Sequence, residues 1–306
     1  MRIIVVIGRV LDPAGIVVNR RAGRIFVNRE EYILQPADRC ALEAALRVKD
    51  AAGAEVIALP RSLLPDDDVL RQALARGADR AIHLVGQVGN LPYEDAAMTR
   101  VLAAAVQRLG GADLILTGAT TLDTGQSQLG PRLAEALGWP QILGAWQVTI
   151  QRVSESAKWM MQAVVMAQRA TLKDVILSDR RERRISWLHE RETLRCAQGD
   201  IFGAVRRDGA GYVTVEADLP AVVTVAPGAL KLRYPDGVRL INVYRAGDAV
   251  ERWEVSDLVD EAALRPQLEK RGQEFPPERE RGVRLSGTPE EMAQALAETL
   301  RQRMRR

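Results

Sequence analysis

The first 150 residues alternate short apolar runs with segments of helical spacing, and this alternation constrains the fold most strongly. Residues 3–7 form a continuous apolar run, which is typical of a strand covered on both faces. Similar runs follow at 55–59, 81–85 and 113–117. Strands that alternate with helices predict βαβ units and a parallel sheet with right-handed crossovers. We therefore expect a doubly wound α/β domain whose ligand crevice lies at the carboxyl ends of its strands.

Helix start and stop signals separate these runs. Pro36 and Asp38 open a helical pattern that ends at Gly53. Three aspartates at 66–68 begin the next helix, where carboxylates meet the positive end of the helix dipole. Further helices are predicted over 95–109, which is rich in alanine, and over 131–137, which begins with proline.

The alternation of strands and helices is not continued after about residue 154. Residues 154–200 are crowded with arginine and glutamate and show no clear order of strands and helices. The arginines at 180–184 could form a basic docking arm, but the interleaved glutamates favour a solvated surface insertion between strands. After residue 201 the pattern turns to short strands, with an exposed loop predicted at 230–241.

The chain ends in a predicted amphipathic helix. Thr288 and Glu291 form a capping box with Pro289 at the first helical position. An apolar stripe follows on one face and would pack on this chain's own sheet or on another subunit. Its residues are Met292, Leu296 and Leu300.

Composition excludes several classes of function. Lys plus Arg number 43 against 40 Asp plus Glu, a net charge of +3, and aromatic residues make up 4%, which argues against nucleic-acid binding. Two cysteines and two histidines leave little material for disulfides, metal sites or histidine catalysis, so no catalytic residue and no metal ligand is assigned. No apolar run is long enough to span a membrane and the first residues read as a core strand, so we expect a cytoplasmic protein without direct membrane insertion.

One loop could bind a phosphate. It follows the strand at 113–117 and leads into a helix, whose free N–H groups favour an anion. Hydroxyl and amide side chains add donors, although an ordinary βα loop with a helix cap has the same composition. The loop consists of Leu122, Asp123, Thr124, Gly125, Gln126, Ser127, Gln128, Leu129, Gly130 and Pro131.

A second candidate lies at the first helix start, in Gln35, Pro36, Ala37 and Asp38. Asp38 could accept a hydrogen bond from an adenine or a ribose, but a helix cap is the favoured interpretation. We interpret His83 and Cys40 as core residues.

Several segments, in order, resemble the beta subunit of the electron-transfer flavoproteins. The opening strand and its Arg-Val-x-Asp turn are similar to the start of that family, and "LQPADRCALEAALRVK" resembles its Asn-Pro-x-Asp/Cys helix start. "ALARGADRAI", the loop and Leu-Gly-x-Pro-Gln ending at 118–141, "LPAVVTV" and the segment 287–296 extend the likeness to most of the chain outside 154–200.

The resemblance implies a fold, cofactors and partners. The fold would be of the adenine nucleotide alpha hydrolase-like type, in a heterodimer with an alpha subunit that shares FAD, and this chain would bind AMP, or a second FAD in an electron-bifurcating oxidoreductase. The complex would be an electron carrier of fatty acid beta-oxidation that takes electrons from acyl-CoA or related dehydrogenases and passes them to a membrane quinone oxidoreductase. The implied nucleotide contacts are Val6, Gln35, Pro36, Ala37, Asp38, the loop near Arg61, and Leu122 to Leu133 with Arg132 included. The implied partner-recognition loop contains Tyr234, Pro235, Asp236, Gly237, Val238, Leu240 and Ile241.

Departures from the family pattern keep a second hypothesis open. Gln35 replaces the family's asparagine, and Pro13 and Ala37 stand where relatives often carry aromatic residues. The alternative is a stand-alone adenine-nucleotide-binding or sensor protein that has lost flavin function. The expected segments are an α/β nucleotide domain at 1–153, a flexible charged insertion at 154–200, the remaining strands and recognition loop at 201–264, and an arm with the docking helix at 265–306.

Overall fold

A computed structural model describes residues 1–19, 21–63, 67–86, 95–152, 159–166, 193–195, 201–204, 212–265 and 285–304. The chain divides into two compact units, one of Met1–Asn19 with Arg24–Glu269 and one of Arg20–Gly23 with Lys270–Arg306. The predicted arm at 265–281 lies almost wholly outside the described residues. Among the described residues, no helix has both the length and the apolar character needed to cross a membrane.

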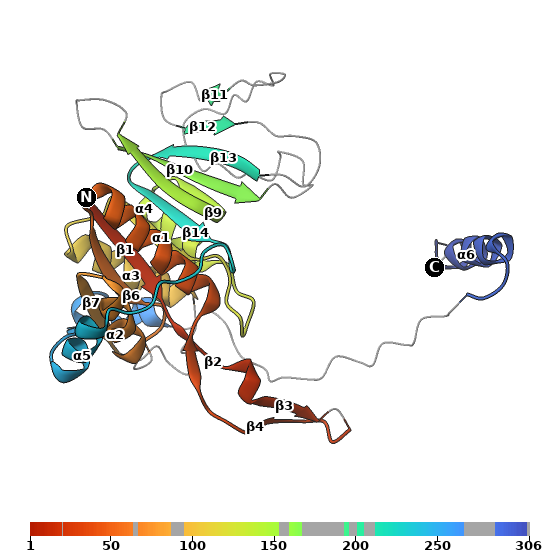
Figure 1. The fold of residues 1–306 in the computed structure, drawn as a ribbon, viewed down its shortest axis with the longest axis horizontal. Helices are drawn as coiled ribbons and strands as arrows, with labels where there is room; N and C mark the ends of the chain where they lie inside the picture. The colour runs from red at the N-terminus through yellow and green to blue at the C-terminus, as the bar shows by residue number, and fades with distance from the viewer. Residues whose placement is uncertain are drawn as a thin grey trace. The chain divides into compact units, whose positions relative to one another are not determined.

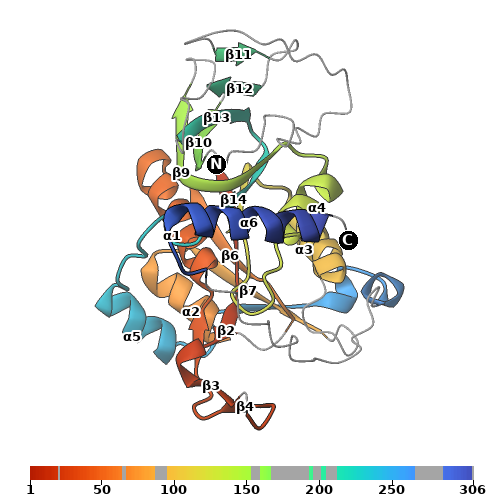
Figure 2. The same ribbon diagram turned by 90° about the vertical axis from the view of Figure 1, so that its right-hand side faces the viewer.

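The first unit is built on a large sheet with the strand order β11-β12-β13-β10-β9-β14-β8-β1-β6-β7-β15 (Figures 1 and 2). Seven neighbouring strands of this sheet are parallel, which confirms the predicted doubly wound α/β fold. They are β9 (Gln141–Arg152), β14 (Ala221–Val225), β8 (Leu114–Gly118), β1 (Arg2–Ile7), β6 (Glu55–Pro60), β7 (Arg80–Val85) and β15 (Glu251–Glu254).

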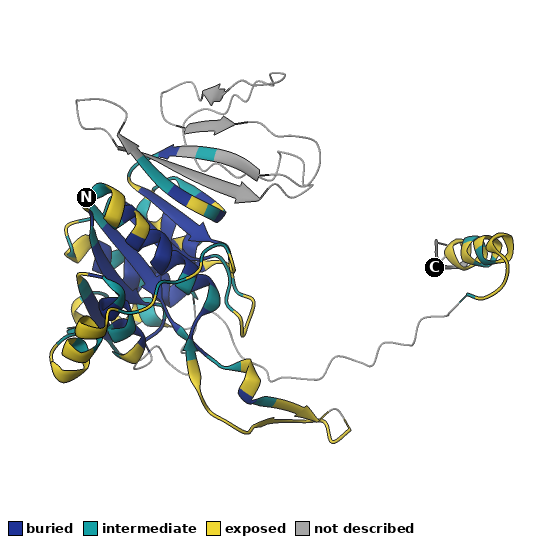
Figure 3. Ribbon diagram, viewed as in Figure 1, coloured by how far each residue is buried: buried dark blue, intermediate teal, exposed yellow. Residues whose placement is uncertain are grey.

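Helices cover both faces of the parallel part, as Figure 2 shows. On one face α1 (Pro36–Ala52) and α2 (Asp67–Arg76) pack on Ile3, Val5 and Ile7. On the other, α3 (Asp95–Arg108) and α4 (Leu129–Leu137) pack on Ile4 and Val6. Both faces of β1 are therefore buried, which explains its continuous apolar sequence and the dark-blue centre of Figure 3.

Beyond β9 the sheet continues with antiparallel strands. The segment 154–200, which showed no clear order of strands and helices in the sequence, contains β10 in its described part, and β10 pairs with both β9 and β13. The apolar run at 159–166 was obscured by its charged surroundings. These strands are β10 (Trp159–Met166), β11 (Thr193–Arg195), β12 (Ile201–Ala204) and β13 (Tyr212–Asp218).

The remaining elements are short. A hairpin of two exposed strands follows β1, and a helix that was not expected, α5, follows β14. They are β2 (Arg9–Leu11), η1 (Pro13–Gly15), β3 (Ile16–Asn19), β4 (Arg24–Val27), β5 (Tyr32–Leu34), α5 (Gly237–Arg245), η3 (Val255–Asp257) and η4 (Glu261–Leu264).

The second unit contains α6 (Pro289–Met304), and the predicted capping box is confirmed. The Thr288 N–H donates to Glu291 Oε2 at 2.9 Å, and the Glu291 N–H donates to Thr288 Oγ1 at 3.4 Å. Leu296 and Leu300, on the apolar stripe, are 50% and 52% exposed. The docking of this helix stays a prediction.

Candidate functional site

The carboxylate of Asp38 lies at the carboxyl ends of three parallel strands. Asp38 sits in the first turn of α1 and is fully buried. Its Oδ2 accepts the Gly8 N–H, directly after β1, at 3.0 Å, and its Oδ1 accepts the Gly118 N–H, at the end of β8, at 3.0 Å. The strand order changes direction between β1 and β8, so this carboxylate occupies the switch point where ligands bind in open α/β sheets.

Arg61 contributes from the third strand end, immediately after β6. Its Nη1 donates to Asp38 Oδ1 at 3.0 Å and to Thr117 Oγ1 at 3.2 Å, and its backbone N–H donates to the Ile7 carbonyl at 2.7 Å. The side chain is only 9% exposed. Its Nη2 is also buried and has no hydrogen-bond partner within the part of the chain that the structure describes.

Two glycines permit this close approach. A Cβ atom at Gly118 would lie 2.2 Å from Asp38 Oδ1 and 2.7 Å from the Ala37 Cβ. A Cβ at Gly8 would lie 2.9 Å from the Arg61 Cβ. Both positions require glycine because helix α1 and the Arg61 side chain press directly on the strand ends.

Burial dominates the electrostatics of the site. Desolvation raises the pKa of Asp38 to about 6, against the opposing effects of Arg61 and the two amide hydrogen bonds. Asp95, at the start of α3, also has a raised pKa because it is partly buried, with Arg61 and Arg132 acting in the opposite direction.

The predicted phosphate loop forms a closed, exposed turn. Thr121 and Thr124 share a hydroxyl hydrogen bond of 2.7 Å, and the Gln126 N–H donates to Thr121 Oγ1 at 3.0 Å. Gly125 has a φ of +68°, which side-chain-bearing residues rarely adopt. Helix α4 begins at Leu129, two residues before the predicted first residue Pro131, and Gly130 lets its first turn pack on Thr224.

This arrangement fits a nucleotide. The helix start and the exposed hydroxyl groups beside it suit a phosphate. The buried Arg61 Nη2 is a donor without an acceptor, while Gln35 Oε1 and Asp95 Oδ2 are acceptors without a described donor. Within the described residues, no group of three His, Cys, Asp or Glu side chains could hold a metal ion.

The structure places the implied contact residues in two environments. Val6, Ala37, Asp38, Leu129 and Leu133 are buried. The exposed loop before α4 contains Leu122, Asp123, Thr124, Gly125, Ser127 and Gln128. The half-buried Gln126 belongs to the same loop, Pro36 lies at the start of α1, Pro131 and Arg132 lie at the start of α4, and Arg61 follows β6. The segments 35–38, 61 and 118–133 do meet at one edge of the sheet, and whether they bind a nucleotide stays a prediction.

The favoured interpretation of Asp38 as a helix cap is wrong. The N-cap residue of α1 is Gln35, and its side chain makes no capping hydrogen bond. Asp38 instead bonds to groups after β1 and in β8 that are 30 and 80 residues away. Sequence reasoning also missed Gly8 and Gly118, although a glycine at the end of a buried strand is a usable signal for close backbone approach.

The predicted recognition loop is partly helical. Asp236 caps α5 by accepting the Arg239 N–H at 2.8 Å, so Gly237, Val238, Leu240 and Ile241 lie on a helix. The sequence predicted an exposed loop over 230–241, but Asp236 begins a helix within it. Tyr234, Val238 and Ile241 are 85%, 69% and 51% exposed, and Tyr244 bonds to Asp68 on α2.

The two residues interpreted as core residues are buried, as expected. His83 Nδ1 lies 2.5 Å from Asp67 Oδ1. Cys40 Sγ lies 3.2 Å from the Leu230 carbonyl oxygen.

Comparisons with known proteins agree with this architecture. The model of the electron transfer flavoprotein domain matches residues 24–176. The chain is 30% identical to the mitochondrial electron transfer flavoprotein subunit beta of Oryza sativa subsp. indica over 95% of both chains, and 26% identical to the subunit beta of Bacillus subtilis over 98% of both. It is 35% identical to Protein FixA of Azorhizobium caulinodans over 53% of this chain and 62% of that protein. The chain belongs to the electron transfer flavoprotein family, among its beta subunits.

Proposed function

We propose that this protein is the nucleotide-binding beta subunit of a heterodimeric electron transfer flavoprotein. The observation that carries the proposal is the convergence of the segments 35–38, 61 and 118–133 at the switch point of the sheet. An alpha subunit would share one FAD with this chain, and AMP or a second FAD would occupy the crevice. Family membership supports the partner and the cofactors, and the exposed loop before α4 supports the phosphate.

In this proposal FAD, when bound, supplies the electron transfer, and the protein supplies binding and orientation. The backbone amides at the start of α4, with Thr124 and Ser127 nearby, would hold the phosphate. Arg61 and Asp38 would give the crevice its shape. This division of roles needs no acid, base or nucleophile from the chain.

The electron donor would be an acyl-CoA dehydrogenase or a related flavoprotein, and the acceptor a membrane quinone oxidoreductase reached from the cytoplasm. Tyr234, Val238 and Ile241 are exposed and lie on or just before α5, with the half-buried Pro235 between them in the sequence. An exposed tyrosine beside aliphatic side chains is a composition typical of protein interfaces. We infer that this surface contacts the donor.

The test is co-expression of this chain with an alpha subunit, followed by identification and counting of the released nucleotides. One FAD and one AMP per heterodimer is the expected result for a simple carrier. Two FAD molecules per heterodimer would indicate an electron-bifurcating enzyme. A chain that carries nucleotide but no flavin and forms no stable heterodimer would contradict the proposal and support the stand-alone nucleotide-binding or sensor function.

That second function has one structural feature in its favour. Pro13, at the position where relatives often carry an aromatic residue, begins the short helix η1 and is exposed. Ala37, at the second such position, is buried against Gly118. Neither residue offers a ring to stack on a flavin, so the nucleotide count decides between the two functions.

A further inference from the structure

The Asp38 side chain has no surface to offer a ligand. It is 0% exposed, and both carboxylate oxygens already accept hydrogen bonds from the protein. A nucleotide at the crevice would therefore meet other groups, and the role of this acid has to be explained by what it holds.

Asp38 connects the ends of three strands through its hydrogen bonds and so fixes the distances between them. Its oxygens lie 3.0 Å from the amide nitrogens of Gly8 and Gly118, and 3.0 Å from Arg61 Nη1. Arg61 reaches on to Thr117 in β8. A single carboxylate thus connects the residues that follow β1 and β6 with the end of β8.

The loop before α4 depends on this connection at its first residue. Gly118 ends β8, and the next residue, Ala119, donates its N–H to the Val225 carbonyl at 2.8 Å. Asp38 therefore fixes the first end of the loop, while its middle is held by the internal hydrogen bonds of Thr121.

We propose that Asp38 and Arg61 are positioning residues of the nucleotide site, and that their buried ion pair sets the spacing of the loops after β1, β6 and β8. The inference rests on the proposed function. It differs from the contacts implied by family resemblance, because the two side chains act on the nucleotide only through the backbone that they hold.

The same helix offers a matched control. Glu43 lies five residues after Asp38 in α1, and its side chain is 5% exposed. Its Oε2 accepts hydrogen bonds from Arg233 Nε and from the Arg233 N–H, both at 3.1 Å. This pair ties α1 to the segment before α5 and makes no hydrogen bond to the strand ends.

The experiment uses the heterodimer depleted of AMP, with calorimetric titration of AMP and of adenosine and with thermal unfolding of each variant. Asp38→Asn and Arg61→Met are expected to weaken both ligands by the same factor, about 10-fold or more, as for other residues that hold ligand-binding groups in place. The double variant is expected to bind no more weakly than Asp38→Asn alone, because both changes break one connection. Glu43→Gln and Arg233→Met are expected to lower the unfolding temperature without changing either affinity.

Several results would overturn the inference. Loss of AMP affinity with unchanged adenosine affinity in Arg61→Met would mean that Arg61 contacts the phosphate directly. Additive losses in the double variant, or equal affinity losses in the control pair, would also contradict it. If Arg61→Met does not fold, Arg61→Lys keeps the charge beside Asp38 and is expected to retain more affinity than Asp38→Asn. Failure of the wild-type heterodimer to bind either ligand would contradict the proposed function itself, whereas binding that no variant alters would contradict only this inference.

Discussion

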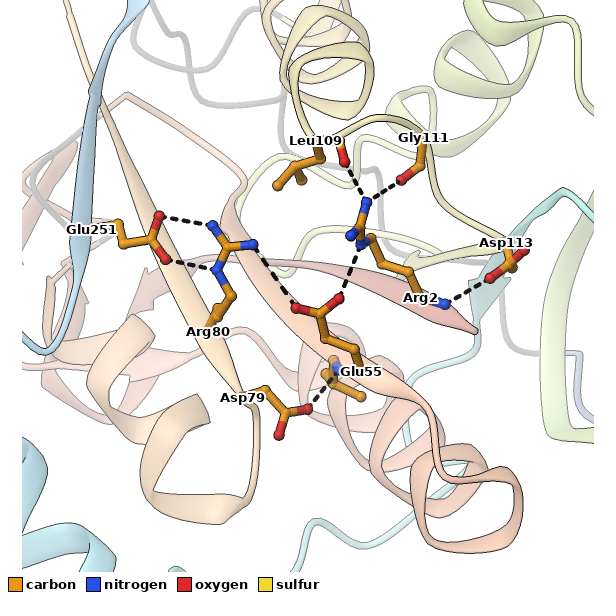
Figure 4. A network of polar contacts seen from close by, with 9 residues as sticks. Arg2, Glu55, Asp79, Arg80, Leu109, Gly111, Asp113 and Glu251 are labelled. Atoms are coloured by element: carbon orange, nitrogen blue, oxygen red, sulfur yellow. Dashed lines mark hydrogen bonds and ion pairs between the residues drawn. The ribbon is translucent and has the colours of Figure 1, made fainter.

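The ion pairs at the two edges of the parallel sheet differ in their exposure to solvent. At the amino edge, Arg80 makes a two-fold contact with Glu251, at 2.7 and 2.9 Å, and Arg2 lies 3.0 Å from Glu55 (Figure 4). These side chains are about one-third exposed, between 33% and 39%. At the carboxyl edge, Asp38 and Arg61 are nearly inaccessible, and Arg61 Nη2 has no partner among the described residues.

The two edges also differ in how completely their polar side chains are paired. At the amino edge, Arg2 also donates hydrogen bonds to the carbonyls of Leu109 and Gly111, so its guanidinium group is bound by other parts of the protein (Figure 4). The carboxyl edge leaves Arg61 Nη2, Asp95 Oδ2 and Gln35 Oε1 without described partners. Buried polar groups are normally paired, so these three unpaired atoms distinguish the surroundings of Asp38 from the paired side chains of Arg2, Glu55 and Arg80.

The largest effect is expected from removing the buried cation. Arg61→Met leaves Asp38 buried without its counter-charge and should lower the free energy of unfolding by about 3–5 kcal/mol above pH 7. Arg80→Met at the amino edge should cost about 1 kcal/mol or less, because its pairs are partly solvated. Urea denaturation of both variants measures the contrast, and equal losses would contradict it.

The two edges should also respond to pH with opposite signs. The Asp38 pKa is raised from 3.8 to about 6, so the folded state holds this proton more tightly than the unfolded chain does. Its contribution to folding should fall by about 3 kcal/mol as the pH rises from about 4 to about 6, and stay constant above that. Partial burial also raises the pKa of Asp95, so its contribution to folding should change with pH in the same direction.

The check is the free energy of unfolding between pH 4 and pH 8. Asp38→Asn cannot titrate, so it should remove most of this slope, although it is less stable throughout because it loses an acceptor. An unchanged slope in Asp38→Asn would show that Asp38 does not cause it.

Adding a methyl group at Gly118, on the carboxyl edge, should lower the free energy of unfolding by somewhat less than Arg61→Met does. Gly118→Ala places a Cβ 2.2 Å from Asp38 Oδ1 and 2.8 Å from the Asp38 nitrogen, so helix α1 must shift. We expect a loss of about 2 kcal/mol, in the range of overpacked sites. Gly247→Ala is the control, because a Cβ there meets nothing within 4 Å. Thermal unfolding distinguishes the two, and a neutral Gly118→Ala would mean that the strand end is loosely held.

The smallest effect is expected at the amino edge. Arg80 lowers the pKa of Glu251, so this acid stabilises the fold above its ordinary pKa near 4.5, and the contribution is lost as the pH falls below that value. Glu251→Gln should cost about 0.5 kcal/mol at pH 7, as for other partly exposed ion pairs. The difference should vanish in acid, and a larger loss at low pH than at pH 7 would contradict the assignment.

Local patterns identified much of the fold and of the loop before α4. The continuous apolar runs predicted the central strands, and the Pro36, Gly53 and Thr288 signals predicted helix ends that the structure confirms. The helix α5 was missed because its only start signal, Asp236, is followed by glycine. Strand β10 was missed because its apolar run lies in a strongly charged segment. Its place in the sheet depends on pairing with the distant strand β13 as well as with β9.

The sequence by itself determined the alternation of strands and helices in the first 150 residues, because burial on one or two faces leaves a periodic pattern of apolar residues. Only the tertiary structure decided the role of Asp38. Its partners Gly8, Arg61 and Gly118 lie 30, 23 and 80 residues away along the chain. They meet because the sheet places β6, β1 and β8 side by side, and no local pattern records which distant amide a buried carboxylate will accept.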